Sequence, residues 1–231
     1  MAFDFLNGEV LLIDKPYGWT SFDVVKKIRN LIKKYTRHKD IKVGHAGTLD
    51  PLASGLLIIC TGKFTKRIDE FQGQEKEYTG TFYIGATTPS YDMESEVNQE
   101  FGTGHITEML LKETAKELTG EQDQVPPTFS AVNVNGTRAY HKARNKENFE
   151  LPPKRINISE FEITNPILPG VGFRIVCSKG TYIRALARDY GQALNSGAYL
   201  TALCRTRIGS FPLKSAMSLE EFEEKLKAET N

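Results

Sequence analysis

The feature that most constrains this chain is the stretch GHAGTLDPLASGLLIIC, residues 44–60. Its glycines permit backbone conformations that other residues avoid, and Pro51 fixes its own φ, so the sequence predicts a loop of one defined shape. The final LLIIC is typical of a buried strand. One carboxylate, Asp50, is therefore expected on a rigid loop at the edge of the core.

Asp50 has two possible interpretations. Asp-Pro pairs and glycines are common in plain turns, which would leave this carboxylate with no chemical role. A carboxylate on a fixed loop can instead act as a nucleophile or a base. The loop alone leaves both interpretations open.

Length and composition indicate a globular protein. The 231 residues have 39% hydrophobic and 26% charged content, which excludes disordered and collagen-like chains. The longest apolar run is too short for a membrane span, and the first residues lack the basic segment of a signal peptide. We therefore expect a cytoplasmic protein with no membrane contact.

Common cofactor and metal signatures are missing from the sequence. Neither GxxxxGK[ST] nor GxGxxG occurs, and the four histidines have no HxxxH spacing. The three cysteines, Cys60, Cys177 and Cys204, include no CxxC pair, so we expect reduced thiols in the core. We expect no metal and no cofactor, with any chemistry performed by side chains.

The charge is distributed in blocks, although its total is only +1. Lys and Arg minus Asp and Glu gives +8 for residues 14–67, −10 for 68–124 and +8 for 125–215. If the two basic blocks share a face, they suit a polyanion such as RNA. The alternative is that these charged residues lie on solvent-exposed helix faces and bind no partner.

Periodicity predicts interspersed strands and helices. The first helix starts at Thr20 or Ser21, with apolar positions at Phe22, Val25, Ile28, Ile32 and Tyr35. Other helices are expected at 106–120, 182–194 and from Ser218, and strands at 9–13, 56–60, 77–85, 129–134, 156–163, 171–177 and 200–211. Residues 90–104 read as an acidic surface loop, and 136–144 as a basic mobile arm. The pattern favours an α+β fold with a mixed, largely antiparallel sheet flanked by helices and loops.

A second region could complement Asp50. The stretch CSKGTYIRALARDYG, residues 177–191, places Arg184 at the start of a helix, where the helix dipole disfavours a cation. A nearby carboxylate would offset that cost, and an arginine beside Asp50 would keep that carboxyl ionised. Arg184 could equally be an ordinary surface charge.

Six blocks of the sequence, taken in order, resemble the motifs of the TruB family of tRNA pseudouridine synthases. They are KPYGWTSFDVV, VGHAGTLDPLASGLLIICTGKFTK, KEYTGTFYIGATTPSYD, PPTFSAVNVNGTRAYHKAR, CSKGTYIRALARDYG and ALCRTRIGSF. Together they extend from about residue 9 to residue 213. The resemblance implies a pseudouridine synthase fold and an enzyme that isomerises uridine to pseudouridine at position 55 in the T loop of tRNA, without a cofactor.

The resemblance also implies roles for individual residues. Asp50, in the GHxGxLDP motif, would be the catalytic aspartate, Arg184 its ionic partner, and Tyr78 the aromatic side chain that stacks on the target base. His45 would hold the T loop open, and Lys15 would support the site from below. Tyr182 would lie beside Arg184, and the basic arm with Arg138, Lys142 and Arg144 would close on the RNA. Whether Asp50 attacks C1′ or removes a 2′ proton is left open.

The same resemblance implies one catalytic domain over residues 1–231, with a thumb-like insertion near 126–150. This chain has Asn133 where the family usually has lysine, so the charge that lysine would bring to an RNA or structural contact is missing at this position. Only 19 residues follow Pro212, so we expect no C-terminal PUA domain. We expect a monomer that binds the tRNA T stem-loop without an obligate protein partner. The alternatives are a tRNA-folding chaperone with secondary catalysis and a guide-RNA-dependent modifier.

Overall fold

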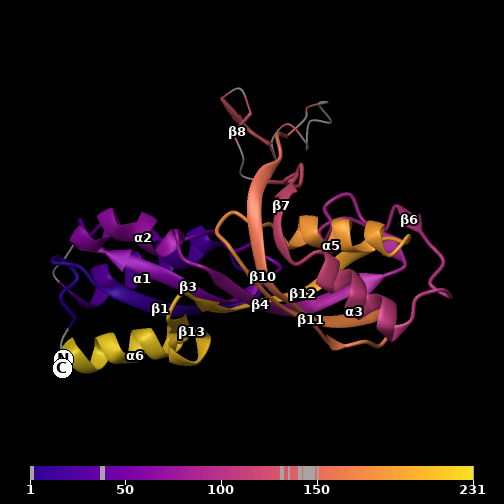
Figure 1. Cartoon of the computed structure of the whole chain (residues 1–231). Helices are drawn as coiled ribbons and strands as arrows, with labels where there is room; N and C mark the ends of the chain where they lie inside the picture. Colours follow the sequence, from indigo (N-terminus) through magenta and orange to yellow (C-terminus); the bar gives the residue numbers. More distant parts are fainter. Residues whose placement is uncertain are drawn as a thin grey trace. The chain divides into compact units, whose positions relative to one another are not determined.

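The computed structural model describes residues 3–36, 40–130, 133–134, 136–139, 142, 149 and 151–230 (Figure 1). The chain forms two compact units. The first unit contains residues 1–78 and 203–231, and the second contains residues 79–202. The boundaries fall inside strands β4 (Lys76–Ile84) and β12 (Ala198–Ile208), so each unit holds part of both strands.

The first unit is built from two segments that are far apart in the sequence. Its strands have the order β1, β3, β12, β4. The β1–β3 and β2–β3 pairs are antiparallel, whereas β3 and β12 are parallel, with Ser54 opposite Cys204 and Gly55 opposite Arg205. The other elements are β1 (Val10–Lys15), α1 (Ser21–Tyr35), β2 (Val43–His45), β3 (Ser54–Thr61), η1 (Gly62–Arg67), α2 (Ile68–Gln72), β13 (Phe211–Pro212), η2 (Leu213–Ser215) and α6 (Leu219–Thr230).

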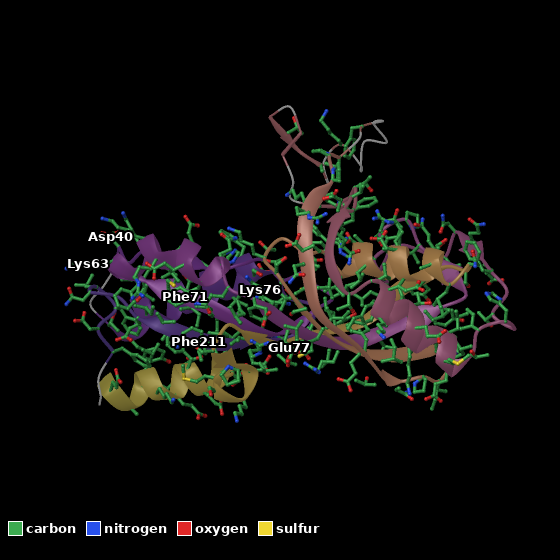
Figure 2. The ribbon with its side chains drawn as sticks, viewed as in Figure 1. Asp40, Lys63, Phe71, Lys76, Glu77 and Phe211 are labelled. Carbon is green, nitrogen blue, oxygen red and sulfur yellow. The ribbon has the colours of Figure 1, made fainter. Side chains whose placement is uncertain are left out.

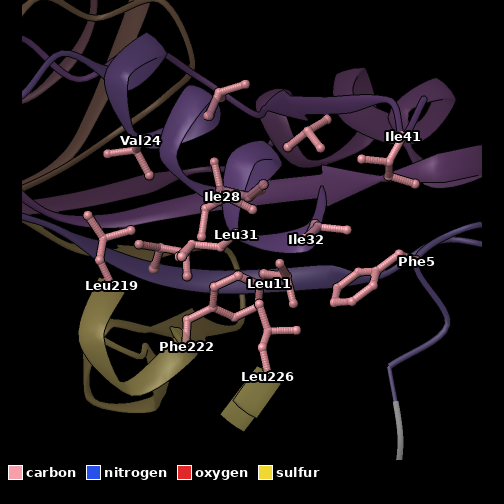
Figure 3. Close-up of a cluster of buried hydrophobic side chains, with 14 of the residues drawn as sticks. Phe5, Leu11, Val24, Ile28, Leu31, Ile32, Ile41, Leu219, Phe222 and Leu226 are labelled. Carbon is pink, nitrogen blue, oxygen red and sulfur yellow. The ribbon is translucent and has the colours of Figure 1, made fainter. Parts of the chain in front are cut away.

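Alternation along β1 and β3 sends apolar side chains to both faces of this sheet. On one face, Leu57 and Ile59 join a core with residues of α1 and α6 (Figure 3). On the other face, Leu56 and Ile58 pack in a second cluster with Phe71 of α2. The Phe71 ring meets Phe211 edge-on at 5.8 Å between centroids (Figure 2). Strand β3 is therefore buried on both sides, as its continuous apolar sequence predicts.

Helix α1 has the predicted start but a different buried face. Thr20 is the N-cap, and Thr20 and Asp23 form a capping box. Phe22, expected in the core, is 63% exposed, whereas Val24 and Leu31 are buried. At 3.6 residues per turn, Phe22 lies about 120° from Ile28 at the centre of the buried face. The prediction for Phe22 was therefore wrong.

The second unit has the strand order β12, β4, β11, β10, β7. The β10–β11 and β10–β7 pairs are antiparallel. Short pairs form between β5 and β6 and between β8 and β9. The elements are β5 (Ala86–Thr87), β6 (Gln99–Glu100), α3 (Glu108–Glu117), β7 (Gly120–Gln124), β8 (Asn133–Val134), β9 (Thr137–Arg138), β10 (Lys154–Asn165), β11 (Gly170–Cys177) and α5 (Ile183–Ala193).

Aromatic residues dominate the core of the second unit. Phe82 stacks on Phe173 at 4.1 Å between centroids, and both Phe82 and Phe161 contact Tyr190 of α5. The acidic stretch 90–104, expected on the surface, begins with two buried residues, Ser90 and Asp92. The two units together confirm the predicted α+β class with a mixed, largely antiparallel sheet flanked by helices.

Candidate active site

Asp50 is half-buried on the loop that joins β2 to β3. The loop is tied to its surroundings on both sides of this residue. Ala53 N–H donates to the Asp50 carbonyl at 3.1 Å, and Gly18 N–H donates to the Pro51 carbonyl at 2.8 Å. The carboxylate is therefore carried on backbone that has little freedom to move.

Ser21, the first residue of α1, fixes the residue before Asp50. Its hydroxyl donates to the Leu49 carbonyl at 3.1 Å and accepts from the Leu49 N–H at 2.8 Å. Ser21 is buried. One hydroxyl thus satisfies both backbone groups of Leu49, and the loop is held to the start of the helix.

Arg205 of β12 is the main support of this loop, and the sequence analysis did not select it. Its side chain is 1% exposed. Its guanidinium donates from Nε to the Leu56 carbonyl at 2.8 Å, from one terminal nitrogen to the Gly47 carbonyl at 3.2 Å, and from the other to the Thr48 carbonyl at 3.4 Å. These carbonyls lie on both sides of Asp50 in the chain, so a single planar group joins the two ends of the loop.

Gly55 permits the close approach of β3 and β12. A Cβ at this position would lie 2.5 Å from the Arg205 carbonyl oxygen and 2.8 Å from the Arg205 nitrogen, and its φ is +102°. Any side chain would therefore separate the strands and would be strained itself. The glycine in the sequence motif is explained by this contact with the strand that carries Arg205.

Lys15 ends β1 beneath the loop and is fully buried. Its ammonium donates to the Pro16 carbonyl at 3.1 Å and to the Trp19 carbonyl at 2.6 Å. Burial lowers the pKa of Lys15 to about 8, although the nearby charge of Asp50 acts to raise this pKa. The charge of Asp50 thus acts on Lys15, and the supporting role of Lys15 stays a prediction.

His45 ends β2, just before the loop. Burial is the main cause that lowers its pKa below the usual value, and the charge of Arg205 adds to the effect. The neutral ring is therefore favoured near neutral pH. Among the described residues, its buried Nδ1 has no hydrogen-bond partner.

Tyr78 is buried in β4, three positions into the strand. Lys76, two residues earlier, is buried and donates to the Gln72 carbonyl at 2.6 Å and to the Gln74 carbonyl (Figure 2). Glu77 accepts from the Thr206 hydroxyl of β12 at 2.7 Å. The strand that carries Tyr78 is therefore anchored on both sides of its backbone.

Arg184 and Tyr182 lie in the second unit. Arg184 is buried and pairs with the buried carboxylate of Asp92, at 3.5 Å between Nε and Oδ2. It also donates to the Phe129 carbonyl at 3.0 Å. The sequence analysis missed Asp92 because it assigned this stretch to the surface. Arg184 and Asp50 belong to different units, so their pairing stays a prediction.

Tyr182 is the N-cap residue of α5. Its N–H donates to Gln124 Oε1 at 2.8 Å, and its carbonyl accepts from Gln124 Nε2 at 3.2 Å. One amide thus fixes the backbone at the start of the helix that carries Arg184.

The basic arm is described only in part. Arg138 lies in β9 opposite Asn133 of β8, and Lys142 is half-buried. The side chain of Arg138 and all of Arg144 lie outside the described residues, as does most of 140–150. The predicted arm and its RNA contacts therefore stay predictions.

Two surveys cover the described part of the chain. No group of three or more His, Cys, Asp or Glu residues there could hold a metal ion. No helix there is both long and apolar enough to cross a membrane.

Comparison with known proteins adds to this geometry. The family model for the TruB family pseudouridylate synthase (N terminal domain) matches residues 33–183. The tRNA pseudouridine synthase B of Flavobacterium johnsoniae is 58% identical over 224 residues, which is 96% of this chain and 98% of the relative. The protein of the same name from Phocaeicola vulgatus is 55% identical over 221 residues, covering 96% of this chain and 94% of the relative.

Solved structures show a similar fold. A chain in the crystal structure of a Cbf5-Nop10-Gar1 complex matches 93% of this chain with a TM-score of 0.71 and 28% identity. This chain spans about half of that one, 53%. The predicted pseudouridine synthase fold is confirmed. The chain belongs to the TruB family of pseudouridylate synthases.

Proposed function

We propose that this protein isomerises uridine to pseudouridine at position 55 in the T loop of tRNA, with Asp50 as the catalytic group. The observation that carries the proposal is the loop of Asp50, which Arg205, Ser21 and Gly18 fix from three directions. Such fixation supports catalysis because a reacting group must be held near its target before the reaction begins. The names of the curated relatives support the choice of tRNA as substrate.

The target uridine must leave the folded RNA before its C1′ and C5 can meet a side chain. Extrusion costs a few kcal/mol in lost stacking. Stacking on Tyr78 would offset about 1–3 kcal/mol of this cost. The anchored strand around Tyr78 supports this role, since a fixed ring loses little freedom when the base binds.

Isomerisation breaks the N1–C1′ glycosidic bond, turns the base and forms a C5–C1′ bond; C5 loses its proton and N1 gains one, so the product has the composition of the substrate. An ionised Asp50 would either bond to C1′ or accept a 2′ proton to give a glycal, and both routes require its negative charge. Arg184 would pair with Asp50 in the complex, and Lys15 would support the site through its hydrogen bonds to the Pro16 and Trp19 carbonyls. His45, Tyr182 and the arm residues Arg138, Lys142 and Arg144 would contact the RNA.

Substitution of Asp50 tests the proposal. Asp50→Asn keeps the size of the side chain but removes the charge, so pseudouridine formation should fall below detection while RNA binding persists. Asp69→Asn, at an exposed position of α2, is the matched control and should retain full activity. The readout is mapping of pseudouridine in tRNA after incubation with the purified protein. Turnover by the Asp50→Asn variant would refute the assignment.

We further propose that the protein acts as a cytoplasmic monomer without a guide RNA. Activity of the purified chain on a bare T stem-loop hairpin would support this, because no guide or partner is then present. Light scattering of the same sample reports its oligomeric state. A requirement for an added RNA or protein would favour the guide-dependent alternative.

A further inference from the structure

Three aromatic side chains lie exposed beside the active-site loop. Tyr17 is 57% exposed, Trp19 36% and Phe22 63%. They occupy the turn after β1 and the first turn of α1, all within the first unit. Large aromatic side chains normally bury most of their surface, so three exposed within six residues indicate a binding surface.

An open cleft of about 340 Å³ has one of these side chains, Trp19, in its lining. It is lined by Gly18, Trp19, Asp23, Lys26, Lys27 and Asn30. Helix α1 carries five Lys or Arg residues against one Asp. The Asp23 carboxylate already accepts from the Thr20 N–H at 3.0 Å and the Thr20 hydroxyl at 2.6 Å. Because Lys26 and Lys27 outnumber Asp23 in this lining, the surface beside Trp19 favours an anion.

The lysines of α1 fall into two groups, one that contacts α6 and one that is exposed to solvent. Lys27 lies 3.7 Å from Glu223 of α6, and Lys34 lies 3.4 Å from the same carboxylate. Phe22, Lys26, Asn30 and Lys33 are exposed, and their spacing places them on one stripe of the helix. This stripe extends about 16 Å at 1.5 Å per residue, the length of two to three nucleotides.

Hydrogen bonds connect the lining of the cleft to Lys15 and to the loop of Asp50. The Trp19 carbonyl accepts from Lys15, and the Gly18 N–H donates to the Pro51 carbonyl. Pro51 directly follows Asp50. A ligand held against Trp19 would therefore be placed in a fixed register with the catalytic carboxylate.

We propose that this cleft binds an unpaired nucleotide of the substrate RNA next to the target uridine. Its base would stack on Trp19, and the adjoining phosphates would follow the stripe of Phe22, Lys26, Asn30 and Lys33. Exposed aromatics combined with cations are the usual means of binding single-stranded RNA. The inference rests on the function proposed above and assigns a second contact to the same substrate.

Trp19 is the only tryptophan in the chain, so its fluorescence reports this cleft alone. The experiment adds a T stem-loop hairpin RNA to the Asp50→Asn protein, in which turnover is blocked. We expect saturable quenching of the Trp19 emission. Quenching should persist in Lys225→Glu, an exposed charge-reversal control on α6, and should need more RNA in Lys26→Glu.

Affinity is measured in parallel with a labelled hairpin. Trp19→Ala should bind about tenfold more weakly, and Trp19→Phe should retain most of the affinity because it keeps an aromatic face. Both keep the carbonyl that Lys15 contacts, and thermal unfolding checks that both fold. Lys26→Glu should remove one phosphate contact, which would reduce the slope of log Kd against log salt concentration by about 0.7 to 0.9.

The outcomes separate the two proposals. If the wild-type protein makes pseudouridine but its Trp19 emission does not respond to RNA, this inference fails and the proposed function stands. Equal affinities for Trp19→Ala, Lys26→Glu and Lys225→Glu would also overturn it. Saturable quenching by RNA without any pseudouridine formation would support the cleft as an RNA site and refute the proposed function.

Discussion

Replacement of Arg205 tests whether this arginine holds the active-site loop in place. Arg205→Met keeps the aliphatic part of the side chain and removes the guanidinium. The carbonyls of Gly47 and Leu56 then lose donors at 3.2 and 2.8 Å, and that of Thr48 loses a longer contact at 3.4 Å. A buried polar group without a partner costs about 1–3 kcal/mol, so we expect the free energy of unfolding to fall by about 3–5 kcal/mol.

Arg205→Met should also lower the rate of catalysis, independently of its effect on stability. Without the guanidinium, the two ends of the loop are no longer joined, and a displacement of about 1 Å costs on the order of 100-fold in rate. We expect this loss in kcat, with a smaller change in KM, at temperatures where the variant is still folded. Arg205→Lys places one ammonium where three separated donors are needed, so it should restore stability only in part.

Arg207 provides the matched control on the same strand. Its partly exposed guanidinium lies 3.1 Å from the Glu75 carboxylate and 3.8 Å from that of Glu77, and donates to the Gly209 carbonyl at 2.9 Å. Surface ion pairs contribute about 0–1 kcal/mol, so Arg207→Met should unfold nearly as the wild type does. Urea unfolding and single-turnover kinetics on tRNA measure the two effects. Equal stability of the Arg205→Met and Arg207→Met proteins, or an unchanged kcat in the former, would refute this account of the loop.

Three further substitutions test other parts of the structure. The charge of Lys15 is lost as pH rises through its pKa of about 8, so pH–rate profiles should show activity falling above pH 8 in the wild type and only at higher pH in Lys15→Arg. Above pH 8 the Lys15 side chain stays protonated in the unfolded chain but loses its proton in the folded protein. Its contribution to the free energy of unfolding should therefore rise with pH, the opposite of the trend in activity, and urea unfolding measures this. Gly55→Ala should lower the melting temperature markedly, since its Cβ would meet the Arg205 backbone at 2.5 Å; wild-type melting would contradict that contact. Asp92→Asn removes the buried carboxylate that pairs with Arg184 and should cost about 3–5 kcal/mol in denaturant unfolding, whereas Glu96→Gln, at an exposed position, should cost little.

Local signals in the sequence predicted the elements well. Helix α1 begins after Thr20, as predicted, and Ser218 and Glu221 form a capping box at the predicted start of α6, with 2.7 and 3.1 Å between their hydrogen-bonded atoms. The buried strand after the glycine loop was also correct. These features depend on neighbours within four residues, which a single sequence displays directly.

Features that depend on distant residues were harder to predict. Arg205 lies in one of the six motifs, yet alternation along a strand cannot distinguish this buried arginine from the partly exposed Arg207 two positions later. Asp92 was assigned to the surface because acidic stretches are usually solvated, and its burial requires Arg184 from another element. The roles of Asp50, Tyr78 and His45 came from the family resemblance, because each of these residue types is common in structural positions.

The position of Arg205 late in the sequence means that the loop with Asp50 is synthesised before its support. This arginine contacts Gly47 across 158 positions and Leu56 across 149. During translation, the loop with Asp50 would leave the ribosome long before its support is made. A product that stops before β12 lacks this support for the loop, so we expect it to be inactive even if its helices have formed. A circular permutation that joins the original ends and starts the chain in the second unit would bring β12 and β3 closer along the polypeptide and should speed assembly of the site.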